Sequence, residues 1–151
     1  MKGVPLVALA LALAGLLPFL WGAGAALNLL PADWRNAQLM PRALSDPDLL
    51  VNYGTIILCF MAGVLWGFAA KARGAVAAAG YAASVVPALW PFFMLGDGRT
   101  ADLLVLAFGF AGLLAFDWGF VRAGLAPAWW LRLRLPVSAV VVVCLGLGLL
   151  G

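Results

Sequence analysis

The sequence predicts an all-α integral membrane protein, a single domain built as a bundle of five transmembrane helices. Hydrophobic residues make up 66% of the 151-residue chain. They fall into five runs, each close to the roughly 20 residues that a helix needs to cross about 30 Å of hydrocarbon. The segments between the runs are short and leave no room for a soluble domain. The predicted spans are residues 4–30, 49–70, 75–95, 103–121 and 135–151.

The first span carries Pro18 near its middle. A proline there removes one backbone hydrogen bond, so we expect a kink. Neighbouring helices can satisfy the carbonyl that the proline frees. Lys2 and the small residues at 23–25 imitate a cleaved signal peptide. Because the apolar run is longer than the roughly 7–15 residues of a signal peptide, we predict that it stays as a span.

The second span ends with Trp66 and Gly67, just before the basic turn at 71–74. The third span carries Pro87 and Pro91, which stand four residues apart and so share one helix face. Together they should bend the outer half of this helix. A broken helix can line a transport site. Proline is also more frequent in membrane helices generally, so we favour a structural kink.

The link before the fifth span is rich in tryptophan and arginine. Paired tryptophans are typical of the headgroup level, and nearby arginines can meet anionic lipid. We therefore predict that this segment lies in the inner interface and that the last span begins at Pro136, which suits a first helical turn. The predicted lipid anchors are Trp129, Trp130, Arg132 and Arg134.

The charged residues predict an orientation with the N-terminus inside and the C-terminus outside. Inner links of membrane proteins carry an excess of lysine and arginine. This orientation places Lys2, Lys71, Arg73, Arg122, Arg132 and Arg134 on the inner side. It leaves Arg35, Arg42 and Arg99 on the outer side.

Small residues are expected to mediate helix packing, because lipid is as apolar as leucine and the hydrophobic effect does not hold helices together within it. Gly63 and Gly67 form a GxxxG pair in the second span. The fourth span has a small-residue face made of Ala107, Ala111 and Gly112.

Asp117 is the one acidic residue inside a predicted span. Ionisable residues within membrane helices are costly and are candidates for function. One interpretation is structural: an ion pair near the inner interface with Arg122, Lys71 or Arg73, or a hydrogen bond to a neighbouring helix. The other is a role in handling a proton or a solute. Four further side chains fall at a similar depth and complete a predicted inner polar cluster: Trp66, Tyr81, Ser84 and Ser138.

The sequence offers little for catalysis. It has no histidine, which removes the commonest general base and the usual ligand of haem and of catalytic zinc. Cys59 and Cys144 have no metal-site spacing and are expected to pack as small apolar groups. We find no phosphate-binding loop and no catalytic pairing. The sequence thus predicts no enzyme activity, no metal, no cofactor and no nucleic-acid binding.

Several segments resemble a family of small membrane proteins that includes mitochondrial transmembrane protein sixty-nine and is classed as a domain of unknown function. The similar segments are residues 15–19, 53–58, 66–67, 84–89 and 127–135, together with Asp117. The family often has a histidine where this chain has Leu65, and a threonine where it has Ser138. The resemblance implies a multi-pass protein of the bacterial inner membrane or its mitochondrial descendant. It brings no activity, cofactor or catalytic residue.

Three functional hypotheses remain. The favoured one is a non-catalytic accessory subunit or assembly factor that packs against a larger membrane complex. The expected partners are the lipid bilayer and either other membrane-protein subunits or copies of the chain itself. The second is a small proton-coupled transporter that uses Asp117 and the inner polar cluster. The third, an enzyme that acts on lipid or quinone, has the weakest support because the sequence has no histidine, no glutamate and no set of residues with metal-site spacing.

Overall fold

The computed structural model describes residues 3–31 and 41–151. These residues form five long α-helices and one short terminal 3-10 helix, with no strand among them. The helices are α1 (Leu6–Ala26), α2 (Leu49–Ala69), α3 (Gly74–Met94), α4 (Arg99–Arg122), α5 (Trp130–Leu147) and η2 (Gly148–Leu150). All five α-helices are long and apolar enough to cross a membrane. The predicted all-helical membrane fold is therefore confirmed.

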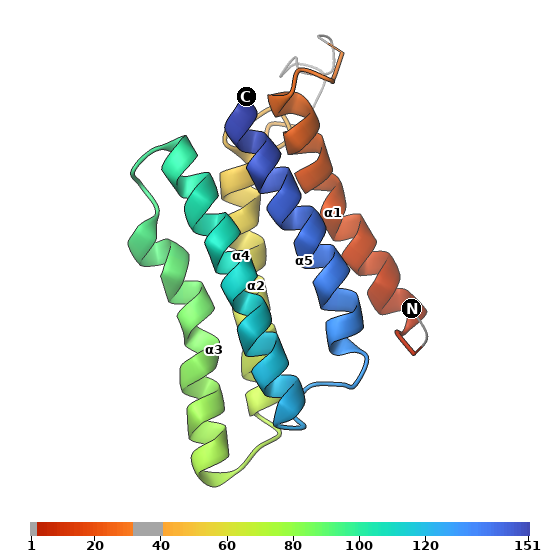
Figure 1. Cartoon of the computed structure of the whole chain (residues 1–151), viewed down its shortest axis with the longest axis vertical. Helices are drawn as coiled ribbons and strands as arrows, with labels where there is room; N and C mark the ends of the chain where they lie inside the picture. Colours follow the sequence, from red (N-terminus) through yellow and green to blue (C-terminus); the bar gives the residue numbers. More distant parts are fainter. Residues whose placement is uncertain (1–2, 32–40) are drawn as a thin grey trace.

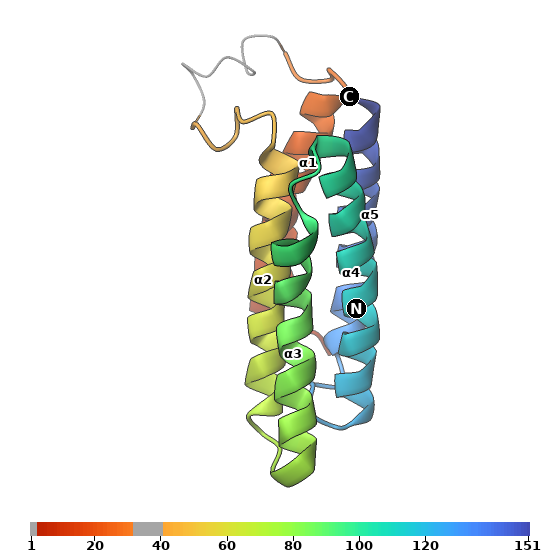
Figure 2. The same ribbon diagram turned by 90° about the vertical axis from the view of Figure 1, so that its left-hand side faces the viewer.

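The helices run side by side along the long axis of the molecule (Figure 1). In this view α3 and α1 lie at opposite edges, and α2, α4 and α5 lie between them. α2 packs against α3 and α4, whereas α5 packs against α4 and α1. Turned by 90°, the same bundle shows the N-terminal end of α1 only part-way along the long axis, while the turn between α2 and α3 reaches its far end (Figure 2).

The interior of the bundle is built from leucine and phenylalanine. Phe19, Leu58, Leu65, Leu106 and Phe110 are all buried, and Phe19 meets Phe110 edge to face at a centroid distance of 6.0 Å. Many equally large apolar side chains point outward, as Leu6 and Phe92 do. An apolar exterior of this kind is expected of helices that are surrounded by lipid.

The three prolines predicted to bend helices lie inside continuous helices. Pro18 is within α1, and Pro87 and Pro91 are within α3. Both of the α3 prolines are buried. Pro136 lies inside α5 rather than in its first turn, because α5 already begins at Trp130. The predicted bends at Pro18 and at Pro87 and Pro91 stay predictions.

The early start of α5 changes the predicted inner link. Residues 130–134 are helical and do not lie along the interface as a separate segment. The orientation across the membrane stays a prediction, and two of the basic residues counted for it, Lys2 on the inner side and Arg35 on the outer side, lie outside the described residues.

Candidate functional site

Asp117 on α4 is completely buried and binds two groups from α5. Its Oδ2 accepts a hydrogen bond from Nε of Arg134 at 2.9 Å, which makes an ion pair. Its Oδ1 accepts a second hydrogen bond from the indole Nε1 of Trp130 at 2.6 Å. Charge-assisted hydrogen bonds of this kind are stronger than neutral ones. The three side chains therefore fasten α4 to α5 at the level of the first turns of α5.

The spacing along α5 explains why both donors reach one carboxylate. Trp130 and Arg134 are four residues apart, and such residues lie on the same face of a helix. The indole of Trp130 is held in turn by Phe68 of α2, which meets it edge to face at a centroid distance of 5.0 Å. Packing against Phe68 thus fixes the position of the indole N–H that donates to Asp117.

The partners of Asp117 differ from those that the sequence suggested. Arg122 lies with its guanidinium 4.8 Å from the ring centroid of Trp118, and Lys71 lies over the ring of Phe68 at 5.2 Å. Trp130 and Arg134, which were predicted to face lipid as anchors, instead turn into the bundle. The sequence prediction placed Trp130 and Arg134 in the link before the fifth span. In the structure both belong to α5, and their positions on that helix direct their side chains inward. Of the other two predicted anchors, Trp129 is half-buried and Arg132 is exposed.

The inner polar cluster divides into separate contacts. The hydroxyl of Ser84 donates to the backbone carbonyl of Tyr81 at 2.8 Å, one turn back in the same helix. The ring of Tyr81 packs against Trp66 with centroids 4.5 Å apart. Ser138 is buried, and its Oγ has no hydrogen-bond partner among the described residues. In that part of the chain no hydrogen bond joins any of these side chains to Asp117.

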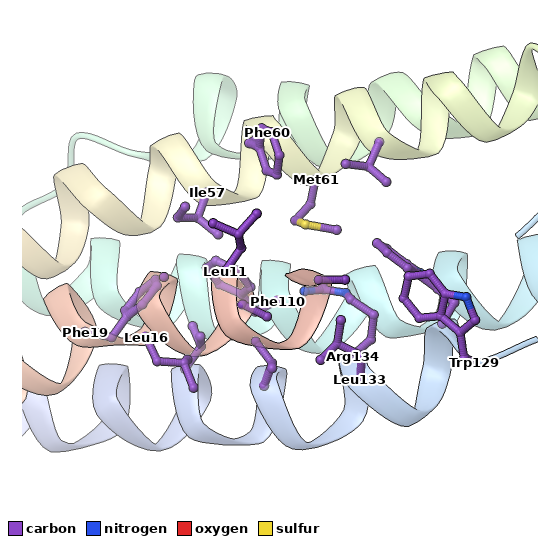
Figure 3. Close-up of a pocket in the computed structure, with 17 residues that line it drawn as sticks. Leu11, Leu16, Phe19, Ile57, Phe60, Met61, Phe110, Trp129, Leu133 and Arg134 are labelled. Carbon is purple, nitrogen blue, oxygen red and sulfur yellow. The ribbon is translucent and has the colours of Figure 1, made fainter. Parts of the chain in front are cut away.

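A cavity of about 420 Å³ lies beside the ion pair, between α1, α2 and α5 (Figure 3). Its walls are apolar and include Leu16, Phe19, Met61 and Phe110. Among the described residues that line the cavity, Arg134 alone carries a charge, and its side chain reaches into the space among these walls. This volume falls within the range of small-molecule sites.

The sequence reasoning missed this cavity, although α1 carries a signal for it. Ala8, Ala12 and Gly15 line the cavity from one face of α1. Their spacing of four and three residues places small side chains at successive turns of that face. A face of small residues can pack closely against another helix, or it can leave a space empty. Both cases have the same sequence pattern, so the spacing alone does not reveal the cavity.

A family model for a protein of unknown function (DUF3429) matches residues 4–150, which is nearly the whole chain. The chain belongs to this family. No curated protein and no solved structure matches it. The family that the sequence resembles is thereby confirmed, and it carries no assigned activity.

In this DUF3429 protein the predicted packing glycines face outward. Gly63 and Gly67 are exposed, and a Cβ atom added at either one would meet no other atom within 4 Å. Gly112 has the same open surroundings, Ala111 is exposed and Ala107 is half-buried. Close contacts inside the chain use other glycines. A Cβ at Gly22 would lie 2.8 Å from Leu50, and a Cβ at Gly109 would lie 2.8 Å from Leu58.

Among the described residues, the side chains that could bind a metal ion do not form a cluster. Cys144 is buried, but Cys59 is exposed, so the expectation that both thiols pack inside is wrong for Cys59. Within residues 3–31 and 41–151, no three histidine, cysteine or acidic side chains lie close enough together to hold a metal ion.

Proposed function

We propose that this protein is a non-catalytic accessory subunit or assembly factor that packs against a larger complex in the bacterial inner membrane. One observation carries the proposal. Gly63 and Gly67 form a GxxxG pair on an exposed face of α2, and no helix of the described chain occupies the space above them. GxxxG faces allow the backbones of two membrane helices to approach closely. A helix from another subunit is the partner that fits this face.

A second small-residue face on α4 supports the same proposal. Ala111, Gly112, Ala115 and Gly119 are all exposed. Both glycines have open space where a Cβ atom would stand. A chain that offers two such faces outward is suited to packing between neighbouring helices in the bilayer.

The contacts of Asp117 favour this structural role over proton-coupled transport. Both carboxylate oxygens accept hydrogen bonds from buried donors, one of them the guanidinium of Arg134. Because both oxygens already bind donors of the same chain, neither is left to bind a transported solute. Asp117 therefore serves best as a link between α4 and α5.

The test compares leucine substitutions at three glycines with the same open surroundings. Gly63→Leu and Gly67→Leu fill the GxxxG face, whereas Gly146→Leu fills an exposed position on α5, where a Cβ also has no neighbour within 4 Å. Each protein is extracted gently at low expression, and partners that co-purify at a fixed ratio are quantified by mass spectrometry. We expect Gly63→Leu and Gly67→Leu to lose a stoichiometric partner that the wild type and Gly146→Leu retain.

Two results would contradict the proposal. One is a wild-type protein that purifies as a monomer or as an oligomer of itself with no other subunit. The other is full retention of the partner by Gly63→Leu and Gly67→Leu.

A further inference from the structure

The guanidinium of Arg134 is only partly used by the contacts within the chain. Its Nε donates to Asp117, but its Nη2 is buried and has no hydrogen-bond partner among the described residues. The side chain as a whole is 6% exposed. A buried donor without an acceptor is costly, and native proteins nearly always supply one. An acceptor that is not part of this chain would relieve that cost.

The cavity that Arg134 lines offers space for such an acceptor. Arg134 lines the apolar cavity between α1, α2 and α5 (Figure 3). Leu11 of α1 and Phe60 of α2 also line it, and they are 69% and 64% exposed. The cavity is therefore bordered by side chains on the outer surface of the bundle, where lipid surrounds a membrane protein. A ligand can enter from the bilayer between α1 and α2.

The charge of the ion pair decides which acceptor fits. Asp117 already neutralises Arg134. An anionic group placed in the cavity would leave one net negative charge in apolar surroundings, which is unfavourable. A neutral carbonyl oxygen supplies the missing acceptor and adds no charge. The cavity thus favours a ligand with an apolar body and a neutral carbonyl group.

The depth of Arg134 points to the ester group of a membrane lipid. Trp129 lines the same cavity five residues earlier in the chain, a distance of about 7 Å along a helix. Tryptophans are enriched at the headgroup level of membranes. The ester carbonyls of a phospholipid lie just below the headgroups, at the border of the hydrocarbon. We propose that the cavity holds one acyl chain of a phospholipid, whose ester carbonyl accepts a hydrogen bond from Arg134.

The first test compares two lipids that differ only in whether their chains carry ester carbonyls. The full chain, purified in detergent, is titrated with ester-linked and with ether-linked phosphatidylethanolamine of the same chain lengths, and bound lipid is counted by native mass spectrometry. We expect one site that prefers the ester lipid by about tenfold, the size of one hydrogen bond to a charged donor. Equal affinity for the two lipids would overturn the proposal.

The second test fills the cavity without touching Arg134. Ala12 faces the cavity, whereas Ala14 is exposed on α1 and does not line it. We expect Ala12→Leu to lose the bound lipid and Ala14→Leu to retain it as the wild type does. Retention by Ala12→Leu, or co-purification of a quinone or a free fatty acid in place of the phospholipid, would overturn the assignment. If Ala12→Leu does not fold, the comparison of the two lipids on the wild type still decides.

Discussion

At the scale of single residues, the carboxylate of Asp117 is held by two donors that differ in kind. Arg134 brings a charge, and Trp130 brings a neutral N–H that is fixed by its packing on Phe68. Removing one member of a buried ion pair leaves the other charge buried and uncompensated. The two donors should therefore contribute unequally to stability, and substitutions can separate them.

Asp117→Asn should strongly destabilise the bundle. It leaves the charge of Arg134 buried without a counter-ion, so we expect a loss of about 3–5 kcal/mol in the free energy of unfolding. Denaturant unfolding in detergent micelles, followed by circular dichroism, measures this loss. The double variant Asp117→Asn with Arg134→Gln removes both charges and should recover part of it. An unchanged unfolding midpoint for Asp117→Asn would show that the pair does not hold the helices together.

Trp130→Phe should have a smaller effect. It keeps a ring against Phe68 but removes the N–H donor to Asp117, so we expect a loss of about 1.5–3 kcal/mol in the same measurement. Trp118→Phe is the matched control because that indole is 53% exposed, and we expect a change within about 0.5 kcal/mol. Equal effects of the two substitutions would contradict the role given to Trp130.

The sequence identified Asp117 as the polar residue to examine, but it did not identify the partners. An acid in an apolar run is conspicuous by composition alone. Whether Arg134 faces lipid or the interior depends on where α5 begins and on its rotation, and Pro136 placed the start too late. A start at least five residues earlier, about one and a half turns of helix, was enough to turn two predicted lipid anchors into the partners of the buried acid.

At the scale of elements, the contrast between inward and outward glycines shows why spacing alone is a poor guide in membranes. In a soluble helix the apolar face identifies the buried side. Here nearly every face is apolar, so periodicity does not separate the lipid side from the interior. Gly63 and Gly67 have the right spacing and face outward, while Gly109 has no such pattern and lies against Leu58 and Trp90.

The two kinds of glycine should respond differently to alanine. At Gly109 a Cβ would come within 2.8 Å of Leu58 and 2.9 Å of Trp90, so we expect Gly109→Ala to lower the free energy of unfolding by about 1–3 kcal/mol. At Gly63 a Cβ meets nothing, and alanine is the better helix former by about 1 kcal/mol. Gly63→Ala should therefore leave stability unchanged or slightly higher. Unfolding of both variants in the same micelles compares them directly, and equal losses would contradict the contacts described for Gly109.

At the scale of the whole molecule, length and hydropathy were sufficient to predict five spans, because a helix that crosses a bilayer needs a fixed minimum of apolar residues. They did not predict which helices are neighbours. That arrangement depends on side-chain contacts, such as the indole of Trp90 donating to the carbonyl of Val105 at 2.8 Å across α3 and α4. The cavity escaped prediction for the same reason, since it exists only once α1, α2 and α5 are placed together.

The orientation can be tested with single cysteines in a Cys59→Ser, Cys144→Ser background. With the N-terminus inside, Ala72→Cys in the α2–α3 turn should react with an impermeant maleimide only after the cells are opened. Asp97→Cys, in the α3–α4 turn, should react in intact cells. The reverse pattern would show that the distribution of arginine and lysine was misinterpreted.

The ion pair also bears on how the bundle responds to membrane voltage. Moving one elementary charge across a membrane potential of 100 mV changes its energy by about 2.3 kcal/mol. Asp117 and Arg134 are joined at 2.9 Å and carry opposite charges, so the electrical work on one nearly cancels the work on the other. The free energy of the folded bundle therefore depends little on the membrane potential, although the bundle contains ionised groups between α4 and α5.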